Sequence, residues 1–153
     1  MKEYQKTIFS NTQQNIIMNI ILDTNILISS LLFRGKASAL YKHIVEGRLT
    51  PCISPSILDE YERVLSYPKF KLTKQEIYYL INEEIRPFYI MYKEPPAGTN
   101  WIIEDPSDNK FIDICIQIHD SFLISGDNHI ISKRQTLPCK ILTLEEYNKQ
   151  FTV

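Results

Sequence analysis

The sequence is poor in glycine and lacks long apolar runs, and both features exclude whole classes of protein. The glycines Gly35, Gly47, Gly98 and Gly126 are too dispersed for a GxGxxG dinucleotide motif or a phosphate-binding P-loop. No GxSxG nucleophile elbow is present. No apolar run approaches the roughly 18 residues of a membrane-spanning helix, and the N-terminal segment lacks a secretory pattern. We therefore expect no membrane partner.

Cysteine and histidine are too sparse to build a disulfide framework or a zinc site. Cys52, Cys115 and Cys139 are odd in number, far apart in sequence and set in apolar surroundings. They are typical of reduced core residues in an intracellular protein, so we expect a cytoplasmic location and no nucleophilic thiol. The three histidines are scattered, with no HExxH or Cys/His ligand spacing, so zinc-dependent hydrolysis is poorly supported.

The remaining composition suits one globular domain. The chain has 153 residues, of which 44% are hydrophobic and 23% charged, and its formal net charge is -1. Because no overall positive field would attract a nucleic acid, such a partner would have to meet a local basic patch or a bound metal. Residues 1–17 are polar and aperiodic. They read as a flexible N-terminal extension or a misplaced start, and the domain itself is expected over residues 18–150.

Apolar periodicity predicts strands that alternate with helices. Strands are expected at Asn19–Leu22, Pro51–Ser54, Phe88–Tyr92, Ser121–Ser125 and Lys140–Leu142. Helices are expected at Ala37–Gly47, after the N-cap Ser54, at Thr73–Arg86 with a Thr73/Glu76 capping box, at Asp105–His119 and at Leu144–Gln150. This alternation predicts an α/β layer fold with a mostly parallel sheet.

Two aspartates follow predicted strands directly. Asp23 interrupts the apolar run "MNIILDTNILIS", and Asp127 in "FLISGDNHII" follows the strand Ser121–Ser125 in the same way. A buried strand has no use for an unpaired carboxylate, which is costly to bury. If the two strands are neighbours, both carboxylates lie at the carboxyl edge of the sheet, where such folds place their ligands.

Two further acidic side chains lie on predicted helices beside the core. In "SPSILDEYERVL", Glu60 flanks the apolar arc and can face the seam between helix and sheet, or simply cover apolar surface. In "EDPSDNKFIDICIQIHD", Asp105 is a natural N-cap and Asp108 lies in the first turn, where helix capping alone would explain both residues. Asp113 lies on another face of that helix and is expected to be peripheral.

Carboxylates that gather at one place repel each other unless they share a proton or a hard divalent cation. Mg²⁺ prefers oxygen ligands, keeps several waters and often bridges to substrate phosphates. A cluster of Asp23, Glu60, Asp108 and Asp127 could therefore support hydrolysis of a phosphodiester with one or two metal ions.

The ordered motifs "ILDTNILIS", "ISPSILDEYERVL", "DPSDNKFIDICI" and "FLISGDNHII" resemble the PIN domain, and most closely its VapC-like ribonuclease toxins. The resemblance runs from about Met18 to the last predicted helix. It implies a single α/β/α sandwich in which helices flank a central, mostly parallel sheet. It also implies an acidic Mg²⁺ or Mn²⁺ site that cuts single-stranded RNA.

The resemblance assigns the catalytic and metal-binding roles to Asp23, Glu60, Asp108 and Asp127. Asn25 and Ser125 match positions that orient the carboxylates in family members, although turn chemistry alone would also explain them. Asn128 stands where many relatives carry another acidic residue, and this departure leaves the number of metal ions open.

The resulting hypothesis is a metal-dependent endoribonuclease that acts as the toxin of a toxin–antitoxin pair. Its expected partners are RNA, a cognate antitoxin and a second copy of the chain. Arg34, Lys36, Lys133 and Arg134 are candidates for contacts with RNA phosphates, or else solvated loop charges. The aromatic residues at Tyr78–Tyr79 and Phe88–Tyr92 are read as core in preference to an interface. The alternatives are a PIN-like interaction module with weak or lost nuclease activity and a DNA nuclease that uses the same acids.

Overall fold

A five-stranded parallel sheet forms the centre of the computed structural model, which describes residues 17–96, 100–102 and 104–151. The strands are β1 (Met18–Leu22), β2 (Leu49–Ile53), β3 (Ile90–Met91), β4 (Phe122–Ile124) and β5 (Lys140–Leu142), and their order is β3-β2-β1-β4-β5. Every neighbouring pair is parallel, so each strand needs a crossover connection. The predicted α/β fold with a parallel sheet is confirmed.

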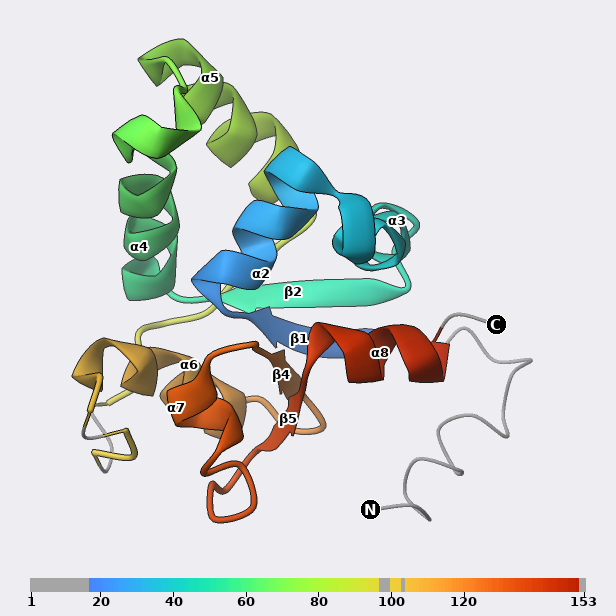
Figure 1. Ribbon diagram of the computed structural model, residues 1–153, viewed down its shortest axis with the longest axis vertical. Helices are drawn as coiled ribbons and strands as arrows, with labels where there is room; N and C mark the ends of the chain where they lie inside the picture. The colour runs from blue at the N-terminus through green and yellow to red at the C-terminus, as the bar shows by residue number, and fades with distance from the viewer. Residues whose placement is uncertain (1–16, 97–99, 103, 152–153) are drawn as a thin grey trace.

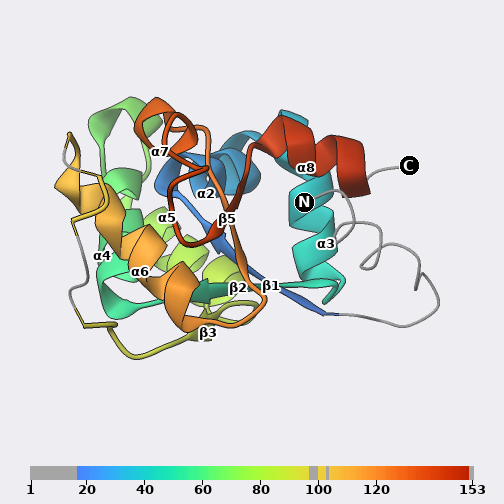
Figure 2. The same ribbon diagram turned by 90° about the horizontal axis from the view of Figure 1, so that it is seen from below.

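Helices cover both faces of the sheet. α2 (Thr24–Ile28), α3 (Ser38–Val45) and α8 (Leu144–Phe151) lie on one side of β1, whereas α6 (Asn109–Gln117) packs on β1 and β4 from the other (Figures 1 and 2). α4 (Pro55–Leu65) contacts both α2 and α6. The shorter elements are α5 (Lys74–Tyr79), α7 (Asn128–Ile131), the π-helical η1 (Ser29–Phe33) and η4 (Leu80–Ile85), and the 3₁₀ turns η2 (Gly35–Ala37), η3 (Pro68–Phe70) and η5 (Pro106–Asp108).

The strands that carry the site are buried on both faces, as parallel crossovers require. Ile20, Ile21 and Leu22 of β1 are inaccessible to solvent or nearly so, and the residues of β4 are buried as well. The hydroxyl of Tyr61 on α4 donates to the Leu22 carbonyl at the end of β1. This bond fixes α4 against the carboxyl end of the central strand, and with it the neighbouring Glu60.

Local signals placed the starts of α4 and α5 correctly, but not that of α6. Ser54 accepts a hydrogen bond from the Ile57 N–H, with Pro55 in the first turn of α4. Thr73 and Glu76 form the predicted capping box. Asp105 caps a turn through the Ser107 N–H at 3.3 Å, but this turn is the 3₁₀ segment η5, and the α-helix begins only at Asn109.

Several predictions of local structure were wrong. The segment after Asp23 forms α2 and η1, for which no helix was predicted, and α7 was also missed. The predicted helix Thr73–Arg86 divides into α5 and the π-helical η4, because a π-type hydrogen-bond pattern replaces the α pattern after Tyr79. The predicted strand Phe88–Tyr92 shrinks to two residues, both exposed at the sheet edge.

The aromatic residues were partly misplaced as well. Tyr89 is buried, as a core assignment requires, but Tyr78 is 71% exposed and Tyr79 is 55% exposed. All three cysteines carry free thiols, yet Cys115 and Cys139 are not apart in space, since their thiols hydrogen-bond to each other. The predicted N-terminal extension, residues 1–17, falls almost wholly outside the described residues. No helix in the described part of the chain combines the length and apolar character needed to cross a bilayer.

Candidate active site

Asp23 lies where β1 passes into α2, beside the end of β4. Its Oδ1 accepts the Ile26 N–H at 2.9 Å and so caps α2, while its Oδ2 accepts the Ser125 hydroxyl and the Gly126 N–H, the latter at 3.3 Å. Leu22 pairs with Ile124 in the sheet, which brings these residues together. Burial raises the pKa of Asp23, the hydrogen bonds from Ser125 and the two amides oppose that rise, and the charge of Asp127 adds to it.

Glu60 is a buried carboxylate on α4 that three donors surround. Its Oε2 accepts the Thr24 hydroxyl from α2. Its Oε1 lies 2.6 Å from Lys110 Nζ on α6 and 3.6 Å from Arg63 on its own helix. Glu60 therefore faces the junction of α2, α4 and α6, whereas its position on the flank of the apolar arc had predicted that it faces the seam between helix and sheet.

Asp108 closes the 3₁₀ turn η5 and is the least satisfied carboxylate of the group. Its Oδ2 is buried and has no hydrogen-bond partner among the described residues. Burial, followed by repulsion from Asp127, Asp105, Glu60 and Asp23, raises its pKa to about 7. Each of the other three predicted acidic residues therefore contributes to the electrostatic environment of Asp108.

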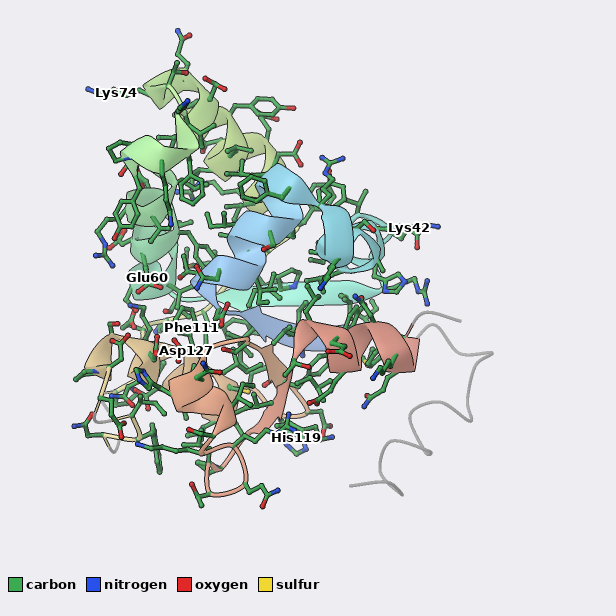
Figure 3. The ribbon with its side chains drawn as sticks, viewed as in Figure 1. Lys42, Glu60, Lys74, Phe111, His119 and Asp127 are labelled. Atoms are coloured by element: carbon green, nitrogen blue, oxygen red, sulfur yellow. The ribbon has the colours of Figure 1, made fainter. Side chains whose placement is uncertain are left out.

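Asp127 completes the group from the loop after β4. Its Oδ1 accepts the His129 N–H at 2.8 Å, and its own N–H donates to the Ser125 hydroxyl at 3.1 Å. Ser125 thus bridges the backbone of Asp127 and the carboxylate of Asp23. Figure 3 shows Glu60 and Asp127 on facing elements, α4 above and α7 below.

The geometry of the site offers a cation a set of oxygen ligands. One ligand atom from each of Asp105, Asp108, Asp127 and His129 lies within 4.8 Å of the others. Asp108 and Asp127 belong to the predicted set, whereas Asp105 was interpreted only as a helix cap and His129 was not considered. The unpartnered oxygen of Asp108 and this donor set fit a divalent cation that accepts oxygen and imidazole ligands.

Two more residues that shape the site were missed. The Thr24 hydroxyl donates to Glu60, and Lys110 forms an ion pair with the same carboxylate. The sequence carries no direct signal for either contact, because Thr24 and Lys110 are far from Glu60 along the chain and reach it only in the folded structure. Of the two predicted orienting residues, Ser125 contacts Asp23, whereas Asn25 is exposed and its side chain makes no hydrogen bond within the described ranges.

The predicted RNA-contacting residues divide into two groups. The ten residues of α2 and η1 separate Asp23 from Arg34, and the Arg34 guanidinium lies 4.0 Å from the centre of the Tyr41 ring. Lys36 is exposed beyond it. Lys133 and Arg134 come shortly after the end of α7 in the chain. Lys133 forms an ion pair with Glu104 at 2.5 Å, and Arg134 forms one with Glu146 at 2.7 Å.

Two further positions that the sequence singles out lie at the margin of the site, and of these Asp113 was expected to be peripheral. Asn128 is exposed at the start of α7. Asp113 lies away from the cluster and accepts a hydrogen bond from Trp101 Nε1 at 3.1 Å.

A family model described as the PIN domain matches residues 19–129, which include all four acidic residues. The chain belongs to the PIN domain family. Members of this family are nucleases, and the acidic group at the carboxyl edge of the sheet lies within the matched segment.

Solved structures share the PIN fold at low sequence identity. VapBC2 from Rickettsia felis, in complex with a DNA fragment from its promoter, contains a similar chain with a TM-score of 0.58 and 15% identity. That match covers 82% of this chain and 98% of the other. The PIN domain endonuclease Utp24 matches with a TM-score of 0.49 and 19% identity, over 82% of this chain and 84% of the other. Among curated proteins, none matches the sequence.

Proposed function

We propose that this PIN domain is a metal-dependent endoribonuclease that cleaves single-stranded RNA and serves as the toxin of a toxin–antitoxin pair. The observation that supports the nuclease assignment is the group of Asp105, Asp108, Asp127 and His129, which each place a ligand atom within 4.8 Å of the others, next to a buried and unpartnered oxygen of Asp108. We propose that Asp23 and Glu60, whose charges raise the pKa of Asp108, complete this site. The structural likeness to a chain of VapBC2 supports the toxin assignment.

Mg²⁺ or Mn²⁺ is the proposed cofactor. Asp108 and Asp127 would hold the ion, with Asp23 and Glu60 contributing directly or through waters. When bound, the ion would activate water and neutralise the charge of the scissile phosphodiester. The proposed ligands could hold one ion or two. Asp105 and His129 are additional candidate ligands.

The residues of the chain prepare this chemistry in distinct ways. Ser125 holds the carboxylate of Asp23 and the backbone of Asp127 in one arrangement, and Thr24 fixes one oxygen of Glu60. These bonds hold the carboxylates before the substrate arrives, which lowers the reorganisation needed in the reaction. Lys133 and Arg134 would contact RNA phosphates by exchanging their present acidic partners for phosphate oxygens.

The remaining proposals concern partners and setting. We expect a cognate antitoxin to bind and neutralise the protein, and two copies of the chain to form a homodimer in the cytoplasm. Residues 18–150 constitute the proposed catalytic domain.

The decisive experiment compares purified wild-type protein with Asp108→Asn, and uses Asp113→Asn as a matched control from the neighbouring helix. Wild-type protein and D113N should cut a mixed single-stranded RNA pool with Mg²⁺ or Mn²⁺ and lose activity with a chelator. D108N should be inactive at the same protein concentration, because it removes a proposed ligand.

Parallel substrates and a binding measurement separate the alternatives. Cleavage of single-stranded or flapped DNA in preference to RNA would replace the ribonuclease proposal with a DNA nuclease. Calorimetry that detects metal binding without cleavage of any substrate would favour an interaction module with lost activity. Equal RNA cleavage by D108N and wild-type protein would reject the site.

A further inference from the structure

Lys110 places a positive charge inside the acidic group. Its Nζ lies 2.6 Å from Glu60 Oε1, and its side chain is only 18% exposed. It projects from the first turn of α6, two residues after Asp108. Among the ion pairs between described residues, the two that involve Glu60 have the most buried acidic member, at 10% exposed, and Lys110 is the most buried basic member.

The other cation near Glu60 is in a different environment. Arg63 lies 3.6 Å from the same oxygen, but its side chain is 61% exposed, so solvent screens its charge. Thr24 occupies the second oxygen of Glu60 with a neutral hydroxyl. Lys110 is therefore the principal charge that offsets this buried carboxylate from within the protein.

A buried carboxylate that loses its closest and most buried cation is strongly unfavourable. Glu60 and Asp108 also repel each other across this junction. An ammonium group next to Glu60 reduces the net negative charge that a divalent cation would encounter at Asp108 and Asp127. Attraction between the cluster and an incoming cation is weakened accordingly.

We propose that Lys110 is a positioning residue that acts as the internal counterion of the acidic cluster and competes electrostatically with the divalent metal. The ammonium holds Glu60 against α6 in the metal-free protein and lowers the affinity of the site for the cation. This inference rests on the proposed function, because it concerns the same metal site, and it assigns a role to a residue outside the four carboxylates.

The first test measures Mn²⁺ affinity by calorimetry for wild-type protein and Lys110→Met. K110M should bind Mn²⁺ about tenfold more tightly, because one positive charge has left the cluster. Lys110→Arg keeps the charge and should stay close to wild type. Arg63→Met should tighten binding less than about threefold, since its charge is screened. Lys149→Met, which removes an exposed charge paired with Glu145, should have no effect.

The second test uses the metal-free protein and needs no metal binding or cleavage. K110M should have a lower melting temperature than wild type. Raising NaCl from about 0.02 to about 0.5 M should increase the melting temperature of K110M more than that of wild type, because salt screens the repulsion that Lys110 no longer offsets. The double variant E60Q/K110M, which removes both charges, should recover most of the loss. It also provides a folded comparison if K110M alone does not fold.

The outcomes separate this inference from the proposed function. Unchanged or weaker Mn²⁺ binding by K110M, with wild-type protein binding normally, would overturn the counterion role and leave the nuclease proposal intact. Absence of metal binding and cleavage in wild-type protein would overturn the proposed function. In that case the salt dependence of the melting temperature of metal-free K110M would alone test the counterion role of Lys110. A salt-induced rise equal to that of wild type would overturn this role.

Discussion

Asp23 and Glu60 lie in a half of the acidic site where protein donors reach every carboxylate oxygen, whereas Asp108 and Asp127 lie in a half that is partly open and incompletely paired. In the first half, Asp23 and Glu60 are among the few buried polar residues of the described chain. In the second, one oxygen of Asp108 is buried without a partner.

This difference separates two ways of stabilising negative charge in a protein. Hydrogen bonds from Ser125, Gly126 and Ile26 stabilise the ionised form of Asp23 against the effect of burial. Asp108 has no such compensation, and its pKa rises to about 7. Protein hydrogen bonds hold Asp23 in the first half, whereas the charge of Asp108 in the second half would be neutralised by a bound ligand.

The largest expected effect comes from breaking the organised half. Asp23→Asn should reduce metal-dependent RNA cleavage by about 10²-fold or more, because it removes a carboxylate proposed to help hold the metal ion. The fold should persist, since the asparagine carbonyl can still cap α2 through the Ile26 N–H. Cleavage assays paired with circular dichroism check both statements, and retained cleavage would remove Asp23 from the site.

A smaller effect is expected at the hydroxyl that joins the two halves. Ser125→Ala removes the donor to Asp23 and the acceptor for the Asp127 N–H. We expect cleavage to fall by about 10–100-fold, typical of groups that orient metal ligands. Ser66→Ala, which removes an exposed hydroxyl bonded to a backbone carbonyl, is the matched control and should cleave normally. Activity of S125A within twofold of wild type would show that the halves are organised independently.

The smallest effect concerns the pH dependence of stability in the incompletely paired half. The pKa of Asp108 rises from the ordinary value of 3.8 to about 7 in the folded protein. The folded state therefore binds more protons than the unfolded state between these values, and the contribution of Asp108 to stability falls as the pH rises through this window.

Asp108→Asn removes that contribution. Metal-free D108N should match wild type near pH 4 and become more stable by about 1–2 kcal/mol near pH 8, less than the full shift implies because the side chain is partly exposed. Urea denaturation with a chelator measures this difference, with D113N as the control. A constant difference between D108N and wild type across the pH range would contradict the assignment.

The strand ends were the part of the site that the sequence could predict. Two acidic residues follow buried apolar runs, and parallel strands end at one edge, so the juxtaposition of Asp23 and Asp127 follows from topology. The side of the helix on which Glu60 lies was predictable from a helical wheel. Its partners were not, because Thr24 and Lys110 reach it only through the packing of α2 and α6 against α4.

Local structure was misjudged where periodicity is ambiguous or the hydrogen-bond pattern changes. The apolar run after Asn25 is compatible with a strand or a buried helix, and sequence pattern alone does not separate them. Asp105 was correctly identified as a cap, but a cap does not specify whether a 3₁₀ turn or an α-helix follows. That distinction matters here because the 3₁₀ turn carries Asp108 into the cluster.

The capping of α2 by Asp23 has a consequence for how this chain could lose its chemistry. The carboxylate that caps the helix is also one of the four proposed to hold the metal ion, so one side chain has both a structural role and a proposed chemical role. An inert descendant of this chain that replaced Asp23 with an apolar residue would also leave the first turn of α2 without its acceptor. Decay of function at this position is thereby coupled to a loss of folding stability.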